Sequence, residues 1–293
     1  MSTTATYYQK SGKTNPLAYV YALLLIVVVA PILAGIYTLA IWHIPFVYLN
    51  FLLAIGFGFV LGLLTAMVVK RMGKVRSGTV GFVLSLLIGL SALYIHWGMW
   101  SDLVLNVSAN GSGMFNLGET FNMLLQPGAL FSFIGEINSI GTWGLSDTTV
   151  SGTFLSVVWL IEAALIAGGT VLFSGGQSDE PFCEISQEWF KSKTLAKFTA
   201  FDSPSALKTS LESGDMSPLE ELGAQDEAAS LNHSVLTLYA NATNENYLSV
   251  SNMISKMKDD EITYDEQILI RNLKISEETS NMLEAKIGAP PSA

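Results

Sequence analysis

Residues 151–174 read SGTFLSVVWLIEAALIAGGTVLFS, and this stretch decides how the rest of the chain is organised. It is apolar for its whole length except for a few hydroxyl side chains and one carboxylate, Glu162. A helix of about 20 residues, rising ~1.5 Å per residue, crosses the ~30 Å hydrocarbon layer of a bilayer. The stretch therefore predicts a membrane-spanning helix that anchors the polar part of the chain following it.

Charged residues divide the chain at the end of this helix. Residues 1–174 contain six Lys or Arg and five Asp or Glu, whereas residues 175–293 contain nine and twenty. We therefore expect a membrane domain in contact with the lipid bilayer, followed by an acidic, solvated domain. A negative domain is repelled by nucleic acid and by anionic lipid headgroups, so we expect no nucleic-acid partner.

Three further apolar runs precede residue 151, each long enough to cross a bilayer. Pro31 lies in the middle of the first run, where the loss of a backbone donor predicts a kink. A cleavable signal peptide has an apolar core of only ~7–15 residues, so we expect this longer run to stay as a helix. The prediction is a membrane α-helical domain, residues 17–174, after a polar tail at 1–16, with spans at 17–42, 47–69, 79–100 and 152–173.

Basic residues set the orientation of these spans. Lys70, Arg71, Lys74 and Arg76 cluster in one short connection, and Lys/Arg-rich connections stay on the cytoplasmic side. No Lys or Arg occurs from Gly78 to Ser174, so the segment 101–150 is predicted to be external and both termini cytoplasmic. Within this external loop, two amphipathic stretches predict a helical hairpin, at 116–126 and 129–140. The absence of secretory features favours a bacterial inner membrane.

Three glycines in the second span predict close helix packing. Gly58 and Gly62 form a GxxxG pattern, and Gly56 lies one half-turn earlier. Small residues one turn apart let two helix backbones approach each other closely. Packing against another helix of the same chain is the first interpretation, and formation of a homo-oligomer is the alternative.

Residues 175–293 predict a small cytoplasmic α+β domain. An amphipathic helix is expected at 188–200, followed by one or two short helices within 204–223. Later segments alternate β-branched and aromatic residues with polar ones and are separated by turn residues, which is typical of antiparallel strands. The predicted strands are 233–242, 247–257 and 261–275, and an acid-capped final helix is predicted at 276–286.

Glu162 and His96 are the candidate intramembrane polar site. Glu162 lies about 16 Å into its helix, near the bilayer midplane, where a charge costs at least ~2.5 kcal/mol. It is interpreted either as a relay or ligand for a proton, ion or substrate, or as a protonated carboxyl that joins two helices. His96 lies nearer the outer interface, where it either lines a polar site with Tyr37, His43 and Tyr94 or is simply hydrated.

The single cysteine, Cys183, excludes an intrachain disulfide and a zinc site built on several cysteines. Residues 181–189, PFCEISQEW, resemble the first knuckle of a zinc ribbon, a Cys-x-x-Cys followed by a polar residue and Trp. Ser186 stands at the second cysteine position, and no second cysteine pair follows. We therefore expect neither a metal nor a cofactor, and interpret Cys183 as a buried thiol in a turn.

Two functions agree best with this architecture, and an intramembrane or membrane-associated enzyme is a third hypothesis that no motif of a known catalytic site supports. The first is a multi-pass membrane protein for signalling or interaction that recruits a basic partner protein through its acidic cytoplasmic domain. The alternative is an oligomeric small transporter or channel that uses the intramembrane Glu162.

Overall fold

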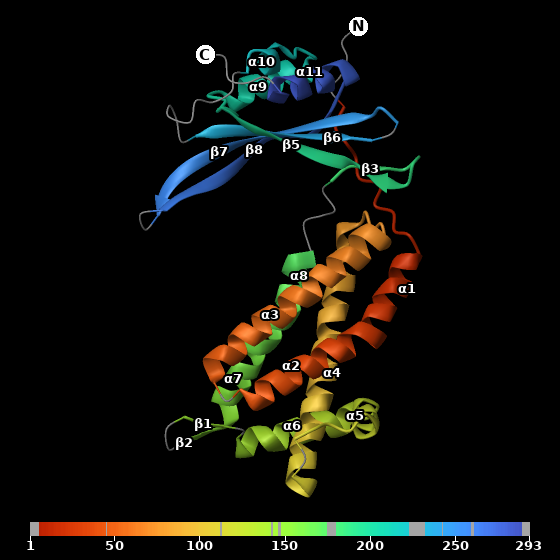
Figure 1. The fold of residues 1–293 in the computed structure, drawn as a ribbon, viewed down its shortest axis with the longest axis vertical. Helices are drawn as coiled ribbons and strands as arrows, with labels where there is room; N and C mark the ends of the chain where they lie inside the picture. The colour runs from red at the N-terminus through yellow and green to blue at the C-terminus, as the bar shows by residue number, and fades with distance from the viewer. Residues whose placement is uncertain are drawn as a thin grey trace. The chain divides into compact units, whose positions relative to one another are not determined.

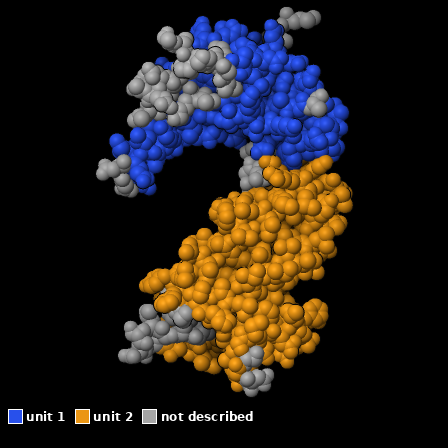
Figure 2. Space-filling view, in the orientation of Figure 1, with its two compact units in different colours: residues 1–10, 179–293 blue, residues 11–178 orange. Residues whose placement is uncertain are grey.

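The computed structural model describes residues 6–44, 46–111, 113–141, 143–145, 148–174, 180–222, 232–241, 243–258 and 261–288. The chain folds as two compact units (Figure 2). One comprises residues 11–178, here called the helical unit. The other, here called the sheet unit, joins residues 1–10 to residues 179–293.

The helical unit contains four helices long and apolar enough to cross a membrane: Leu17–His43, Tyr48–Met72, Gly78–Ser108 and Gly152–Ser174. Large apolar side chains are exposed along all of them, among them Leu23, Leu52, Phe82 and Leu160. The prediction of four long apolar helices is confirmed. Their elements are α1 (Leu17–Leu24), η1 (Leu25–Val29), α2 (Ala30–His43), α3 (Val47–Ala66), η2 (Met67–Met72), α4 (Gly78–Asn110), α7 (Gly152–Ala163), η3 (Ala164–Gly168) and α8 (Gly169–Ser174) (Figure 1).

The interruption predicted at Pro31 takes the form of a π-helical turn. Pro31 is among the first two residues of α2, directly after η1. Proline has no N–H to donate, and its ring clashes with the carbonyl four residues earlier. A wider π turn accommodates both problems and is a recognised cause of bends in long helices.

Helix α4 continues about ten residues further than predicted, into the segment expected to be loop. It ends where Gly111 adopts a left-handed conformation with φ of 67°. Ser101 and Asp102 do not end the helix because both side chains are buried on its inner side. The predicted helical hairpin follows as α5 (Leu117–Leu124) and α6 (Pro127–Ile140), and β1 (Trp143–Leu145) then pairs with β2 (Thr148–Val150).

Two of the three glycines predicted for helix packing lie where α3 meets the fourth span. A Cβ added at Gly58 would lie 2.6 Å from the Leu165 carbonyl oxygen, and one added at Gly62 would lie 2.5 Å from the Phe173 Cβ. A Cβ added at Gly56 would meet nothing within 4 Å. Gly58 and Gly62 therefore allow a close approach of helices within this chain, whereas Gly56 lies outside that contact.

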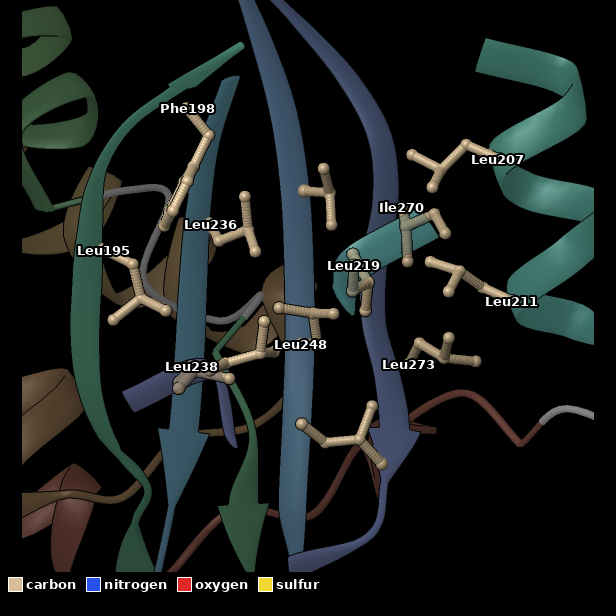
Figure 3. Close-up of a cluster of buried hydrophobic side chains, with 13 residues drawn as sticks. Leu195, Phe198, Leu207, Leu211, Leu219, Leu236, Leu238, Leu248, Ile270 and Leu273 are labelled. Atoms are coloured by element: carbon tan, nitrogen blue, oxygen red, sulfur yellow. The ribbon is translucent and has the colours of Figure 1, made fainter. Parts of the chain in front are cut away.

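The sheet unit is built on a four-stranded antiparallel sheet in the order β5-β6-β7-β8. Helices cover one face, and leucines from strands and helices fill the space between, including Leu236, Leu248 and Leu211 (Figure 3). A small hairpin of β3 and β4 precedes the sheet. The bounds are β3 (Phe182–Cys183), β4 (Glu188–Trp189), β5 (Lys191–Thr199), β6 (His233–Ala240), β7 (Asn246–Lys258), β8 (Glu261–Ile275), α9 (Pro204–Glu212), α10 (Ser217–Glu220) and α11 (Glu277–Gly288).

The helix predicted at 188–200 is wrong, because β4 and β5 occupy this segment. Leu195 and Phe198 are three residues apart, a spacing typical of one helix face, and both are buried in the core. A register shift in the β5–β6 pairing lies between these two residues. A β-bulge of this kind places two apolar residues three apart on the same face of a strand, which produces a helical spacing without a helix.

The N-terminal segment, predicted to be a free tail, extends the sheet. Tyr7 bridges Leu273 in antiparallel orientation. The Tyr8 amide donates to the Asn272 carbonyl at 2.9 Å, and the Lys274 amide donates to the Thr6 carbonyl at 2.8 Å. Residues that precede the first span therefore fold with residues that follow the last one.

We predict that Gly58→Ala and Gly56→Ala have opposite effects on the helical unit. The Gly58 methyl would meet backbone atoms of the fourth span, and such overpacking costs about 1–3 kcal/mol. The Gly56 methyl would meet open space and would gain ~0.5–1 kcal/mol of helix propensity. Thermal denaturation of the full chain in detergent measures both, and equal melting temperatures for the two variants would contradict the packing described above.

Candidate functional site

Four polar side chains from three spans meet inside the helical unit. The Tyr37 hydroxyl in α2 donates to Oε1 of Glu162 in α7 at 2.6 Å. The Nε2 atom of His96, in α4, lies 3.5 Å from the same oxygen. The other ring nitrogen of His96, Nδ1, lies 2.8 Å from the Thr38 hydroxyl. The structure thus brings the two predicted residues, Glu162 and His96, to one place.

This cluster is enclosed by the packed helices. His96 is only 1% exposed and Thr38 is fully buried, so the interpretation of His96 as a hydrated interfacial residue is wrong. The Glu162 side chain is 15% exposed. Phe57 of α3 stacks on the Tyr37 ring with centroids 4.8 Å apart, so that all four spans contribute to the site.

The other aromatic and histidine residues predicted near His96 are elsewhere. His43 is exposed, and its Nδ1 lies 2.9 Å from the Leu39 carbonyl. The Tyr94 hydroxyl donates to the Leu124 carbonyl at 2.7 Å and so joins α4 to α5. Of the three residues suggested as companions of His96, only Tyr37 takes part in the cluster.

Three tryptophans lie beside the cluster, Trp97 and Trp100 on α4 and Trp159 on α7. The Trp97 and Trp159 rings are 4.8 Å apart, edge to face, and Trp100 packs against both. Edge-to-face aromatic pairs of this kind contribute about 0.5–1.5 kcal/mol beyond their burial. They hold α4 against α7 next to the His96 and Glu162 side chains.

Asp102 is a buried carboxylate that the sequence analysis did not single out. It is 1% exposed and accepts hydrogen bonds from the Asn116 amide at 2.5 Å, the Thr120 hydroxyl at 3.0 Å and the Asn106 side chain at 3.0 Å. These bonds attach the start of α5 to the C-terminal part of α4. The sequence could have indicated Asp102, since it is the only charged residue between Arg76 and Glu119.

The four residues predicted to set the topology lie at the end of the second span and in the connection that follows. Lys70 and Arg71 belong to η2, and Lys74 follows it. Arg76 is buried, and its guanidinium donates to the Ser11 hydroxyl at 3.2 Å and to the Lys74 carbonyl at 2.8 Å. This arginine therefore also fixes the segment that leads into the first span.

Cys183 is a buried thiol in the β3–β4 hairpin and accepts from the Ser186 amide at 3.4 Å. Burial raises the pKa of this thiol, but hydrogen bonds from Ser186, Ile185 and Thr243 outweigh burial, and the pKa falls below its usual value. Within the described residues, no group of three or more His, Cys, Asp and Glu side chains is placed to hold a metal ion.

Part of the sheet carries exposed apolar side chains on the face opposite the helices. Here β7 and β8 form a long hairpin, and cross-strand pairs place Met257 beside Ile262, Ser255 beside Tyr264 and Ser251 beside Ile268. In this register these residues lie on one face of the sheet, and Leu248 and Val250, which belong to the core, lie on the other face. We call the exposed group, between 40% and 73% accessible, the hairpin surface: Met257, Ile262, Tyr264 and Ile268.

Comparison of the chain with protein-family models, with curated proteins and with solved structures gave no match. The candidate sites are therefore supported by the geometry and chemistry of this chain alone.

We predict that Asp102→Ala loosens α5 from α4. The substitution leaves the buried Thr120 hydroxyl and the partly buried Asn116 amide without their acceptor, and an unpaired buried donor costs about 1–3 kcal/mol. Limited proteolysis of the full chain should then cut residues 111–126 faster than in the native protein. Glu119→Ala, at an exposed position on α5, is the matched control, and equal cleavage of both variants would refute the role given to Asp102.

Proposed function

We propose that the protein is an integral membrane protein that holds an acidic domain at the membrane surface and uses it to recruit a partner protein. The hairpin surface is the observation that carries this proposal. Large exposed apolar patches are uncommon on soluble domains and often mark sites of association.

Membrane insertion is supported by the helical unit. Its four long helices expose apolar side chains outward, while their polar side chains, such as Glu162 and Thr38, lie inside the unit. In hydrocarbon, only helices and closed barrels satisfy all backbone hydrogen-bonding groups. An outward apolar surface on helices of this length is what a lipid environment requires.

Placement of both chain ends on one side of the membrane is supported by the N-terminal strand. Residues 6–8 pair with the end of β8, so the segment before the first span and the domain after the last belong to the same folded unit. Four crossings return a chain to the side where it began. The basic connection after the second span favours the cytoplasmic side, in a bacterial inner membrane.

The chemistry of the partner follows from the surroundings of the hairpin surface. Glu266 lies on the same face, opposite Met253. Glu261 lies on the same strand, Asp265 is paired with Lys256, and the domain as a whole is acidic. Partners with complementary charge associate faster and more selectively. We therefore propose a partner that presents apolar side chains flanked by Lys or Arg.

Transport through Glu162 receives less support than recruitment. The Glu162 carboxylate is bonded to Tyr37 and lies beside His96 within the helix packing, which is the arrangement of a group that joins helices.

The decisive experiment compares Ile262→Gln with Ile185→Gln in the full-length protein. Both positions are exposed isoleucines of the sheet unit, but Ile185 lies on the β3–β4 turn, away from the hairpin surface. Each protein is cross-linked in native membranes, purified and analysed by mass spectrometry. Burial of one isoleucine is worth about 1.5–3 kcal/mol, so Ile262→Gln should weaken a specific partner about tenfold or more.

The control, Ile185→Gln, should retain the same partner as the native chain, and raised ionic strength should weaken that complex. Equal recovery of the partner by both variants would reject the hairpin surface as the binding site. Recovery of no protein dependent on residues 180–293 would reject recruitment itself.

A further inference from the structure

The hydrogen atoms on His96 can be assigned from its neighbours. The Thr38 hydroxyl lies 2.7 Å from the Ala34 carbonyl and 2.8 Å from His96 Nδ1. A hydroxyl has one hydrogen, and a carbonyl oxygen only accepts. Thr38 therefore donates to Ala34, and the remaining contact requires Nδ1 of His96 to carry a hydrogen and donate it to Thr38.

The second ring nitrogen of His96 faces a carboxylate. Nε2 lies 3.5 Å from Glu162 Oε1, and His96 is too buried to bond to water instead. If Nε2 were unprotonated and Glu162 ionised, a lone pair would face an anion in a medium that cannot screen the repulsion. A proton must therefore lie between the two groups. Oε1 already accepts the Tyr37 hydroxyl, which favours the proton on Nε2.

The lack of a permanent positive charge within the four spans also requires this proton. The sequence has no Lys or Arg between Lys13 and Lys70, or from Gly78 to Ser174, so these helices offer Glu162 no permanent cation. One proton leaves the His96–Glu162 pair neutral overall. Its loss would leave a single anion among the spans, at a cost of ~2.5 kcal/mol or more.

The other titratable groups on the packed helices do not change this balance. From α2 the only one at the site is the Tyr37 hydroxyl, and α3 contributes the ring of Phe57. On α4, Tyr94 bonds to Leu124 and Asp102 bonds to α5, both away from the pair. The α7 and η3 segments contain no titratable side chain besides Glu162.

We propose that Thr38, His96, Glu162 and Tyr37 form a proton-binding site within the four spans. A single proton resides on Nε2 of His96, which is thereby an imidazolium that donates to Thr38 from Nδ1 and forms an ion pair with Glu162 Oε1 at 3.5 Å, while the same oxygen accepts from Tyr37. The bound proton thus connects α4 to α7 through the ion pair, and the hydrogen bonds of Tyr37 and Thr38 connect both helices to α2. This inference is independent of the proposed recruitment of a partner.

The test is nitrogen NMR of the full-length protein labelled with ¹⁵N-histidine in detergent or nanodiscs at pH 8. The chain has three histidines, and the spectrum of His96→Asn identifies the His96 signals. A free imidazole is neutral at this pH, with one protonated nitrogen. We expect His96 to show two protonated nitrogens, and a neutral His96 in the native protein would overturn the proposal.

Two variants test whether the Glu162 carboxylate is the reason that His96 is doubly protonated. Glu162→Gln removes the carboxylate and should convert His96 to the neutral form protonated only on Nδ1. Glu136→Gln removes an exposed carboxylate from α6 of the same unit and should leave His96 doubly protonated. A doubly protonated His96 in Glu162→Gln would also overturn the proposal. Should that variant fail to fold, the measurement on the native protein decides by itself.

Discussion

Hydrocarbon offers no partner for a backbone N–H or C=O, and in the membrane setting that we propose this constraint governs the helical unit. It explains why each apolar run becomes one long helix and why the local defect at Pro31 is absorbed by a π turn rather than by an open loop. The same constraint acts on side chains. The Ser174 hydroxyl donates to Ser85 at 2.6 Å, and Tyr37 donates to Glu162, so polar groups pair between helices of the unit.

Long apolar runs and the alternation of apolar and polar residues in strands made much of this fold predictable from the sequence. The four spans, the strands near 233–242, 247–257 and 261–275, and the final helix all depend on patterns within one segment. The segment 188–200 was mispredicted because a β-bulge between Leu195 and Phe198 imitates the spacing of a helix. The N-terminal strand was missed because its partner, β8, lies more than 260 residues away.

The candidate site was predictable only in part, for a similar reason. A single carboxylate in a long apolar run is conspicuous in the sequence, so Glu162 was predicted, and His96 was noted for its position near the end of the third predicted span. The contact between them depends on how α2, α4 and α7 pack, which no single segment encodes. Thr38 looks like an ordinary helical hydroxyl until its bond to His96 is known. Asp102 was overlooked because the helix was expected to end before it.

The central proposal is that the chain crosses a membrane four times, with the α5–α6 segment on one side and, on the other, the sheet unit, which joins residues before the first long helix to residues after the last. Cysteines introduced at Ser108 and Ile185, both exposed, test it with a membrane-impermeant maleimide. The native Cys183 is buried and provides the background. In intact cells Ser108→Cys should be labelled, and Ile185→Cys only after the membrane is permeabilised. Labelling of both from the same side would contradict the four-span topology.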